Sequence, residues 1–381
     1  MTYDVVIAGA GPVGSAAAGE CARLGLSTLC IEEHGTIGHP VQCAGLLSNA
    51  AFSECRVSER TVLNRVTGAR IFSGTGPGLL IDAKRTMACV VDRCALDREM
   101  AGHAANSGVE FRLKTSVCGI RGNTLRTRGV YGPEEIPFRI LIAADGPRSS
   151  IARYLGMERA RMFLAGIQVD IPRASDPRYV ELYPDAAPDF FGWAIPATPD
   201  ITRIGMCTGA DIPARFEAFQ KKFGENSLHL VTGTLPLGVM PRTYGHRTLF
   251  VGDAAGLAKP TSGGGIYTGV RSARHAAAVA AEACECDRFD DPVLAGYERR
   301  WQADFGSELE LGFRLLGMRQ RMTPADVRDI LAALDDPEII RTIEEYGDMD
   351  RPGTVVKKLL LKPGMLRLLG PLLATGLRSF F

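Results

Sequence analysis

Three glycines near the start of the chain, Gly9, Gly11 and Gly14, have the spacing Gly-x-Gly-x-x-Gly. Residues 3–8 are apolar and predict a strand that leads into them, and the alanine-rich residues 14–24 predict a helix that follows. In such a unit the first glycine permits a tight turn, the second lets the backbone approach a pyrophosphate, and the third lets helix and strand pack closely. Free N–H groups at the helix N-terminus then face the phosphates. The spacing therefore predicts a dinucleotide site.

An acidic side chain follows the next predicted strand. Residues 27–31 predict this strand, and Glu32 follows it directly. At that point a carboxylate accepts hydrogen bonds from the ribose hydroxyls of an adenosine. Glu33 is the less favoured partner. The alternative is a glycine-rich turn followed by a solvated acid, and the agreement of strand, turn, helix and acid argues against it. The chain has one such fingerprint, so any nicotinamide would bind transiently rather than on a second domain of this type.

Composition limits the class of protein. With 381 residues and 46% hydrophobic content, the chain can bury a large core spread over two or three units. A formal net charge of +1 gives no overall field that would attract nucleic acid. The chain enters its first strand without the basic region and cleavage site of a signal peptide, and it has no run of about 18 apolar residues. These patterns favour a cytoplasmic protein.

Cysteines and histidines show no ligand spacing. The ten cysteines are scattered without a Cys-x-x-Cys pair, which favours reduced thiols over disulfides. The six histidines show no metal spacing, and we predict no metal site. Most of the thiols are expected to be small core residues, and Cys43 is the exception to consider.

The order of these patterns predicts an α/β chain whose Rossmann-like dinucleotide-binding domain is discontinuous. This domain is expected to comprise residues 1–61, 89–162 and 242–289. Its later elements are a helix at 93–107 and strands at 110–117, 140–144 and 248–251. Residues 62–88 and 163–241 show alternating positions that predict a substrate-binding β-sheet domain lying over the cofactor. Residues 290–381 are predicted to be a helical C-terminal region, with Pro324 in a first helical turn.

Three segments, in this order, resemble the flavoprotein fold of aromatic hydroxylases, flavin-dependent halogenases and geranylgeranyl reductases. They are Gly-Ala-Gly-Pro-Val-Gly at 9–14, Ala-Asp-Gly-Pro-Arg-Ser at 144–149 and Val-Gly-Asp-Ala-Ala-Gly at 251–256. The resemblance implies FAD as the cofactor. It also implies that the segment of Asp145 supports the cofactor and the substrate-facing structure. Asp253 is expected to bind the ribityl chain, because a carboxylate accepts strong hydrogen bonds from hydroxyl groups.

Further cofactor contacts are expected elsewhere. By the same resemblance Arg93 reaches the diphosphate region, although it could also be a surface arginine at a helix start, and the backbone of Val117 touches the adenine end. The N–H groups of Gly265 and Ile266 precede an alanine-rich helix and are expected at the pyrimidine edge of the flavin, where a helix N-terminus stabilises negative charge. The full expected set of cofactor-binding residues is Gly9, Gly11, Val13, Gly14, Glu32, Cys43, Ala44, Arg93, Val117, Asp145, Asp253, Gly265 and Ile266.

Two more segments are similar to geranylgeranyl reductases. Residues 38–46, Gly-His-Pro-Val-Gln-Cys-Ala-Gly-Leu, resemble their cysteine-containing loop beside the isoalloxazine. Residues 190–196, Phe-Phe-Gly-Trp-Ala-Ile-Pro, resemble their aromatic motif on the substrate sheet, which implies that Phe191, Trp193 and Pro196 line the substrate site. Residues 347–352 and 357–360 resemble the C-terminal part of archaeal digeranylgeranylglycerophospholipid reductases, the branch of this family to which the resemblance is greatest.

The motifs also depart from the family. Phe191 stands where these reductases commonly have tyrosine, Ile195 replaces a frequent aromatic residue and Leu46 replaces a frequent glycine. For Cys43, packing against the flavin is the favoured role, and tuning of the flavin and proton donation are the alternatives. Trp193 is expected to be a wall of an apolar tunnel, with a purely structural tryptophan as the alternative.

The resemblance implies a reductase that saturates isoprenoid double bonds. A hydride from N5 of reduced FAD and a proton would add to the two carbons of a prenyl double bond, and the sequence does not identify the proton donor. The expected partners are an isoprenoid lipid and an external reductant, either NAD(P)H or a ferredoxin-type donor. One alternative is a flavin-dependent monooxygenase or halogenase, and another is a non-catalytic flavoprotein that binds lipid or carries electrons.

The C-terminal segment, residues 351–381, combines basic residues with leucines and has no acidic residue. Such a segment would suit a lipid with an anionic head group, or peripheral contact with the inner membrane surface. The alternative is that the leucines pack onto the protein and the cations are solvated, because prolines and glycines interrupt any long surface helix.

Overall fold

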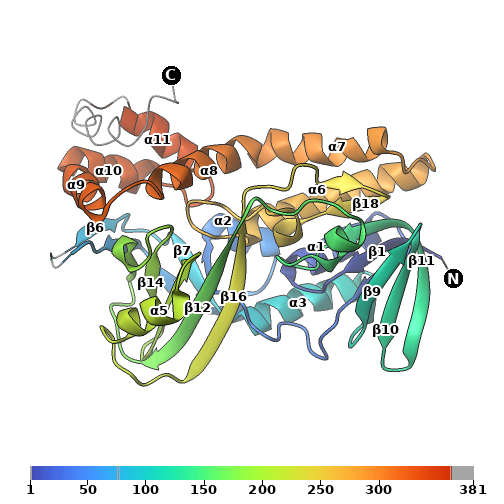
Figure 1. Cartoon of the computed structure of the whole chain (residues 1–381), viewed down its shortest axis with the longest axis horizontal. Coiled ribbons are helices and arrows are strands. Elements are labelled where there is room, and N and C mark those ends of the chain that lie inside the picture. The colour runs from blue at the N-terminus through green and yellow to red at the C-terminus, as the bar shows by residue number, and fades with distance from the viewer. Residues whose placement is uncertain (1, 75, 77, 361, 363–381) are drawn as a thin grey trace.

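The computed structural model describes residues 2–74, 76, 78–360 and 362 of the chain. Figure 1 shows two sheets beside each other with long helices along one side. The first sheet contains the glycine turn, and its main path runs β17-β18-β11-β1-β2-β8. Its strands are β1 (Tyr3–Ala8), β2 (Thr28–Ile31), β8 (Glu110–Arg112), β9 (Ser116–Arg121), β10 (Thr124–Gly129), β11 (Gly132–Ala143), β17 (Tyr244–Gly245) and β18 (Thr248–Phe250).

The centre of the first sheet is parallel and buried. β1 pairs in parallel with β11 and β2, so that Val5 lies opposite Ile140 on one side and Thr28 on the other. β1, β2 and the last four residues of β11 are almost entirely buried, because helices cover this part of the sheet. The helices that pack around this core are α1 (Pro12–Arg23), α3 (Arg93–Asn106), α6 (Ile266–Glu285) and α7 (Asp291–Trp301).

The second sheet has seven strands in the order β16-β12-β15-β14-β13-β5-β6. All of its neighbouring pairs are antiparallel except β13 with β5. The strands are β5 (Gly68–Ile71), β6 (Leu79–Asp82), β12 (Met162–Pro172), β13 (Tyr179–Tyr183), β14 (Gly192–Thr198), β15 (Ile201–Thr208) and β16 (His229–Leu237). A small third sheet, β3 (Leu46–Ser48), β7 (Ala88–Val91) and β4 (Val62–Val66), leads into α2 (Asn49–Cys55) and α3.

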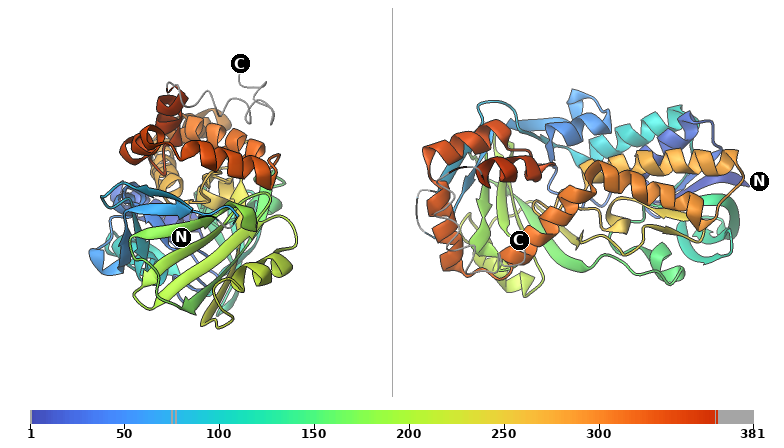
Figure 2. Two further views of the ribbon diagram at one scale, coloured as in Figure 1. Left: turned by 90° about the vertical axis from the view of Figure 1, so that its left-hand side faces the viewer. Right: turned by 90° about the horizontal axis from the view of Figure 1, so that it is seen from above.

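Helices of the C-terminal region run along one side of the molecule and pass over both sheets (Figure 2). They are α7, α8 (Ser307–Arg319), α9 (Pro324–Leu334), α10 (Pro337–Tyr346) and α11 (Pro352–Leu360). Pro324 is the first residue of α9, and a capping box between Thr323 and Asp326 fixes that helix start. Among the described residues, no helix has both the length and the apolar character needed to cross a membrane.

Several expected elements differ from the structure. Residues 110–117 were expected as one strand, but the chain breaks near Lys114, which has a φ of 51°, and forms β8 and β9. Within 163–241, expected as sheet, α5 (Ile212–Gln220) buries Phe216 and Phe219 against the second sheet, a helical spacing embedded among strands. β4 pairs with β7 rather than with the second sheet.

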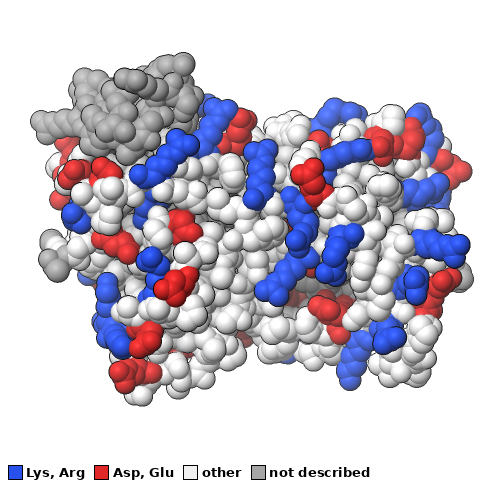
Figure 3. Space-filling view, viewed as in Figure 1, with Lys and Arg blue, Asp and Glu red and all other residues white. Residues whose placement is uncertain are grey.

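The domain division remains a prediction. Most of the basic C-terminal segment, residues 361 and 363–381, lies outside the described residues. On the face shown in Figure 3, positive and negative side chains are interspersed, as expected for a formal net charge of +1.

Candidate active site

A single cavity of about 1250 Å³ extends from the glycine turn to the second sheet and the C-terminal helices. All thirteen expected cofactor-binding residues, from Gly9 to Ile266, contribute to its lining, although they come from segments far apart in the chain. Phe191 and Trp193 line it as well. Pro196 does not; it is buried in β14, where its carbonyl accepts a hydrogen bond from Asn64.

The glycine turn is shaped by two close backbone contacts and one open position. Gly9 has a φ of +100°, and a Cβ there would lie 2.3 Å from the carbonyl oxygen of Ala144. A Cβ on Gly14 would lie 1.9 Å from the carbonyl oxygen of Gly9, whereas a Cβ on Gly11 would meet nothing within 4 Å. Gly9 and Gly14 are therefore required by packing, and the space at Gly11 fits an approaching pyrophosphate.

Glu32 directly follows β2, and each of its carboxylate oxygens accepts a hydrogen bond from the backbone. One oxygen accepts a hydrogen bond from the backbone N–H of Ala10 at 2.8 Å. The other accepts from the backbone N–H of His34 at 2.9 Å and lies 2.7 Å from Nδ1 of that side chain. Because a carboxylate has about four acceptor positions, Glu32 keeps capacity for a ribose hydroxyl.

Asp253 is partly buried in the turn after β18, between β18 and the start of α6. Burial raises the pKa of Asp253 to about 6, and the positive charge of Arg93 partly opposes this shift. Its carboxylate receives no hydrogen bond from the described residues, and a Cβ on Gly265 would come within 2.6 Å of its Oδ1. The carboxylate therefore has unused acceptor positions that face the cavity, and the hydroxyls of a ribityl chain would fill them. The residues present therefore fit FAD.

Asp145 organises its own loop. Its carboxylate accepts hydrogen bonds from the hydroxyls of Ser149 at 2.8 Å and Ser150 at 3.2 Å, and from the backbone N–H of Ile151 at 3.0 Å. These bonds fix the start of α4 (Ser150–Tyr154) and the turn at Gly146, which lines the cavity. Asp145 thus acts on the cavity through the loop that it holds.

Arg93 and Cys43 lie together at the cavity wall. Nε and Nη2 of Arg93 each donate to the carboxylate of Asp97 at 3.0 Å. Burial disfavours the charge of Arg93, but the neighbouring Cys43 and Asp97 raise its pKa above the usual value. The Cys43 sulfur also accepts a long hydrogen bond, 3.4 Å, from the N–H of Gly45. Cys43 is therefore adjacent to a permanent cation.

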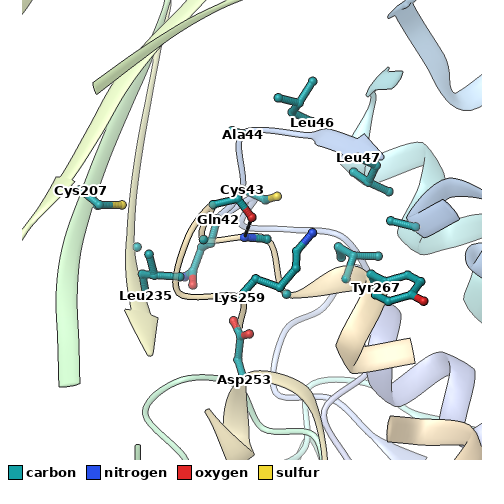
Figure 4. Close-up of a pocket in the computed structure, with 18 of the residues that line it drawn as sticks. Gln42, Cys43, Ala44, Leu46, Leu47, Cys207, Leu235, Asp253, Lys259 and Tyr267 are labelled. Carbon is teal, nitrogen blue, oxygen red and sulfur yellow. Dashed lines mark hydrogen bonds between the residues drawn. The ribbon is translucent and has the colours of Figure 1, made fainter. Parts of the chain in front are cut away.

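A buried ion pair between Lys259 and Asp350, close to Cys43, was not predicted from the sequence. Nζ of Lys259 binds the carboxylate of Asp350 and donates to the carbonyl of Met349 at 2.9 Å, and Ser48 donates to the same carboxylate. The Lys259 and Asp350 side chains are only 8% and 2% exposed. Figure 4 shows Lys259 between Cys43 and Tyr267, extending away from Asp253. Lys259 is the only charged residue among the apolar and small residues 254–266, and this could have marked it as a buried cation. No nearby sequence pattern indicates that Asp350 is its partner.

The substrate-facing wall combines aromatic side chains on and beside β14 with aliphatic side chains of the second sheet and the C-terminal helices. The indole N–H of Trp193 donates to Gln168 at 3.2 Å, and Phe190 stacks on Phe191 at 4.3 Å. A Cβ on Gly205 would lie 2.6 Å from the Trp193 ring, so this glycine lets the indole lie against the backbone. The aliphatic part is lined by Ile71, Ile81, Leu182, Leu315, Met318, Met322, Val327, Ile330, Leu331 and Ile343.

Comparisons with known proteins agree with this geometry. A family model described as an FAD binding domain matches residues 2–208. Digeranylgeranylglycerophospholipid reductase 2 of Methanothermobacter thermautotrophicus is 31% identical over 380 residues, which cover 92% of this chain and 98% of that protein. A digeranylgeranylglycerophospholipid reductase of Thermoplasma acidophilum is 31% identical over 328 residues, which cover 78% of this chain and 83% of that protein.

Solved structures give the same result. A geranylgeranyl bacteriochlorophyll reductase-like protein of Thermoplasma acidophilum matches with a TM-score of 0.84 at 25% identity, covering 94% of this chain and 98% of that one. The p-nitrophenol 4-monooxygenase of Pseudomonas putida matches with a TM-score of 0.71 at 17% identity, covering 90% and 96%, which shows a shared fold alone. FAD is therefore the cofactor, and the chain belongs to the family of FAD-dependent geranylgeranyl reductases.

Proposed function

We propose that this protein is an FAD-dependent reductase that saturates geranylgeranyl double bonds of archaeal-type ether phospholipids. The observation that carries the proposal is the continuity of one cavity, which joins a dinucleotide turn to a long aliphatic chamber. Relatives named as digeranylgeranylglycerophospholipid reductases, matched over most of both chains, support the substrate class. An isolated prenyl double bond has no polar handle, so an apolar chamber of this kind is what its binding requires.

The reaction adds one hydride and one proton across a double bond. Bound FAD, once reduced, supplies the hydride. The aliphatic side chains of the second sheet and of α8 to α10 position the prenyl chain and keep water away from it. The N-terminus of α6, at Gly265 and Ile266, directs free N–H groups into the cavity and favours negative charge there.

Cys43 is proposed to lie against the flavin ring, with packing as its favoured role. Its neighbour Arg93 is permanently charged and already paired with Asp97. The guanidinium favours a nearby anion, so the pair could also tune the flavin. The proton donor is not assigned by these contacts. An external reductant, NAD(P)H or a ferredoxin-type protein, and peripheral membrane contact complete the proposal.

The test is an anaerobic incubation of the chemically reduced holoprotein with a digeranylgeranylglyceryl phospholipid, followed by mass spectrometry of the lipid. A stepwise gain of two hydrogens per double bond is expected. Hydroxylated lipid formed only after oxygen is admitted would instead indicate a monooxygenase. Tight lipid binding without chemical change under either condition would indicate a flavoprotein that only binds lipid or carries electrons.

A further inference from the structure

The charges that line the cavity differ in how they are neutralised. Its lysine and arginine side chains, among the described residues, are Arg93, Lys259 and Arg319. The first two form ion pairs with Asp97 and with Asp350. Arg319, at the C-terminal end of α8, forms no ion pair with any described carboxylate. It is therefore the cation of this cavity whose charge is left for a ligand.

Arg319 also has unused hydrogen-bond donors. Its Nη2 donates to the carbonyls of Pro184 at 2.7 Å and Ala187 at 3.1 Å, and its Nη1 donates to the carbonyl of Pro188 at 3.1 Å. A guanidinium carries five N–H groups, so Nε–H and one N–H of Nη1 have no partner among the described residues. The three carbonyls fix the orientation of the guanidinium, which reduces the entropy that a ligand's binding would cost.

The nearest acids do not neutralise this cation. Burial lowers the pKa of Arg319, and the more distant charges of Asp185 and Asp189 only oppose the shift. Asp185 accepts hydrogen bonds from Ser73 and the N–H of Gly74. Asp189 accepts from Thr208 and the N–H of Gly209. Each carboxylate is thus engaged with its own donors.

The surroundings of Arg319 define the shape of the ligand. Aliphatic side chains of β5, β6 and β13 and of helices α8 to α10 line the same cavity as Arg319. Two carboxylates line the cavity from the C-terminal helices and the loop after them: Glu344 accepts from the N–H of Asp82, and Asp348 accepts from the N–H groups of Asp350 and Arg351. A long apolar chamber with one unpaired, oriented cation fits an amphiphile with one anionic end.

We propose that Arg319 binds the phosphate group of the prenyl lipid and makes the enzyme selective for anionic over neutral isoprenoids. This inference rests on the proposed function, because it specifies the substrate of the same cavity. The free N–H on Nε and the free N–H on Nη1 can each donate a charge-assisted hydrogen bond to a phosphate oxygen. The same chemistry is offered by a prenyl glycerophosphate and by a free prenyl diphosphate.

The test measures binding to the oxidised holoprotein, so that it does not depend on turnover. Digeranylgeranylglyceryl phosphate and the neutral digeranylgeranylglycerol, in identical detergent micelles, are titrated against the flavin absorption spectrum. Geranylgeranyl diphosphate is titrated in a third series. The variant is Arg319→Met. The matched control is Arg321→Met, because Arg321 is an exposed arginine two residues later that does not line the cavity.

Arg319→Met is expected to weaken binding of the phosphate about 10- to 100-fold, the range for a charged hydrogen-bonded contact, and to leave the alcohol unchanged. Arg321→Met should change neither. Equal loss for phosphate and alcohol would overturn the proposal, because Arg319 would then only support the turn at Pro184. Unchanged phosphate binding would overturn it as well.

Two further comparisons keep the outcome decisive. If Arg319→Met does not fold, Arg319→Lys keeps the charge but loses the N–H groups on Nε and Nη1, and it should weaken phosphate binding alone by a smaller factor. A parallel loss for geranylgeranyl diphosphate assigns the site to prenyl phosphates in general, and loss for the glycerophosphate alone assigns it to the lipid. Phosphate-selective binding without any reduction of the lipid would contradict the proposed function and leave the role of Arg319 intact.

Discussion

The two ends of the cavity are built in different ways. At the dinucleotide end, the shape comes from backbone conformation within short segments, as at Gly9 and Gly14, where a single Cβ would collide with a carbonyl. At the lipid end, the shape comes from residues that meet across long sequence distances, such as Arg319 with the carbonyl of Pro184. A site of the first kind tolerates little substitution and carries a local motif. A site of the second kind can change its ligand without changing the fold.

The largest expected effect lies at the dinucleotide end. Gly14→Ala should abolish FAD binding and destabilise the fold by about 3 kcal/mol or more, because its Cβ would lie 1.9 Å from the Gly9 carbonyl oxygen. Gly11→Ala is the matched control. Its Cβ meets nothing within 4 Å and its φ of −65° suits alanine, so the FAD-free protein should keep its unfolding midpoint and lose only FAD affinity. Thermal unfolding and FAD titration of both variants test this, and equal destabilisation would contradict it.

Removal of one member of the buried ion pair should be nearly as severe. Lys259→Met leaves the carboxylate of Asp350 buried without its cation, which is expected to cost about 3–5 kcal/mol of unfolding free energy. The double variant Lys259→Met/Asp350→Leu should recover most of that loss, since no charge then stays unpaired. Urea unfolding of the single and double variants measures the difference. A double variant as unstable as the single one would show that the packing of these two side chains, and not their charges, stabilises the contact between residues 259 and 350.

Substitution of Asp253 by asparagine should stabilise the FAD-free protein but weaken its binding of FAD. Its pKa of about 6 in the folded state exceeds the value of 3.8 for an isolated side chain, so burial of its charge costs stability above about pH 6 and nothing below about pH 4. Asp253→Asn should therefore stabilise the FAD-free protein at pH 8, by up to about 3 kcal/mol, and by little at pH 4, while FAD affinity falls. Urea unfolding of the FAD-free protein at both pH values provides the measurement. A gain that does not change with pH would refute this assignment.

The smallest effect is expected at Cys43. If its role is packing, Cys43→Ala should keep the rate of lipid reduction within about threefold of the wild type, whereas loss of a proton donor typically costs about 10²-fold or more. Single-turnover reoxidation of the reduced flavin by the lipid measures this rate. Cys43→Ser provides the control for size. A large loss in both variants would contradict the packing role.

The same contrast explains what the sequence predicted. The glycine turn, Glu32 and the segment of Asp253 were predictable because each depends on a few consecutive residues, and all of them line the cavity. Pro196 was named for the substrate wall because its motif lies there, but strand alternation and a buried position direct it elsewhere.

Arg319, Lys259 and Asp350 were not predicted. Their roles arise where the C-terminal helices pack on the two sheets, and no local pattern encodes which residues meet there. The helix α5 shows a similar limit, because its short apolar spacing is surrounded by strand-like sequence. Local motifs therefore predicted the cofactor end, and tertiary packing decided the lipid end.

The most direct test of the central claim is the stoichiometry of the anaerobic reaction. The holoprotein, reduced with two electrons per flavin, is mixed with a digeranylgeranylglyceryl phospholipid without oxygen, and flavin reoxidation is compared with the saturation found by mass spectrometry. The account predicts one double bond saturated for each flavin reoxidised. Flavin that stays reduced until oxygen enters, with the lipid unchanged, would contradict it.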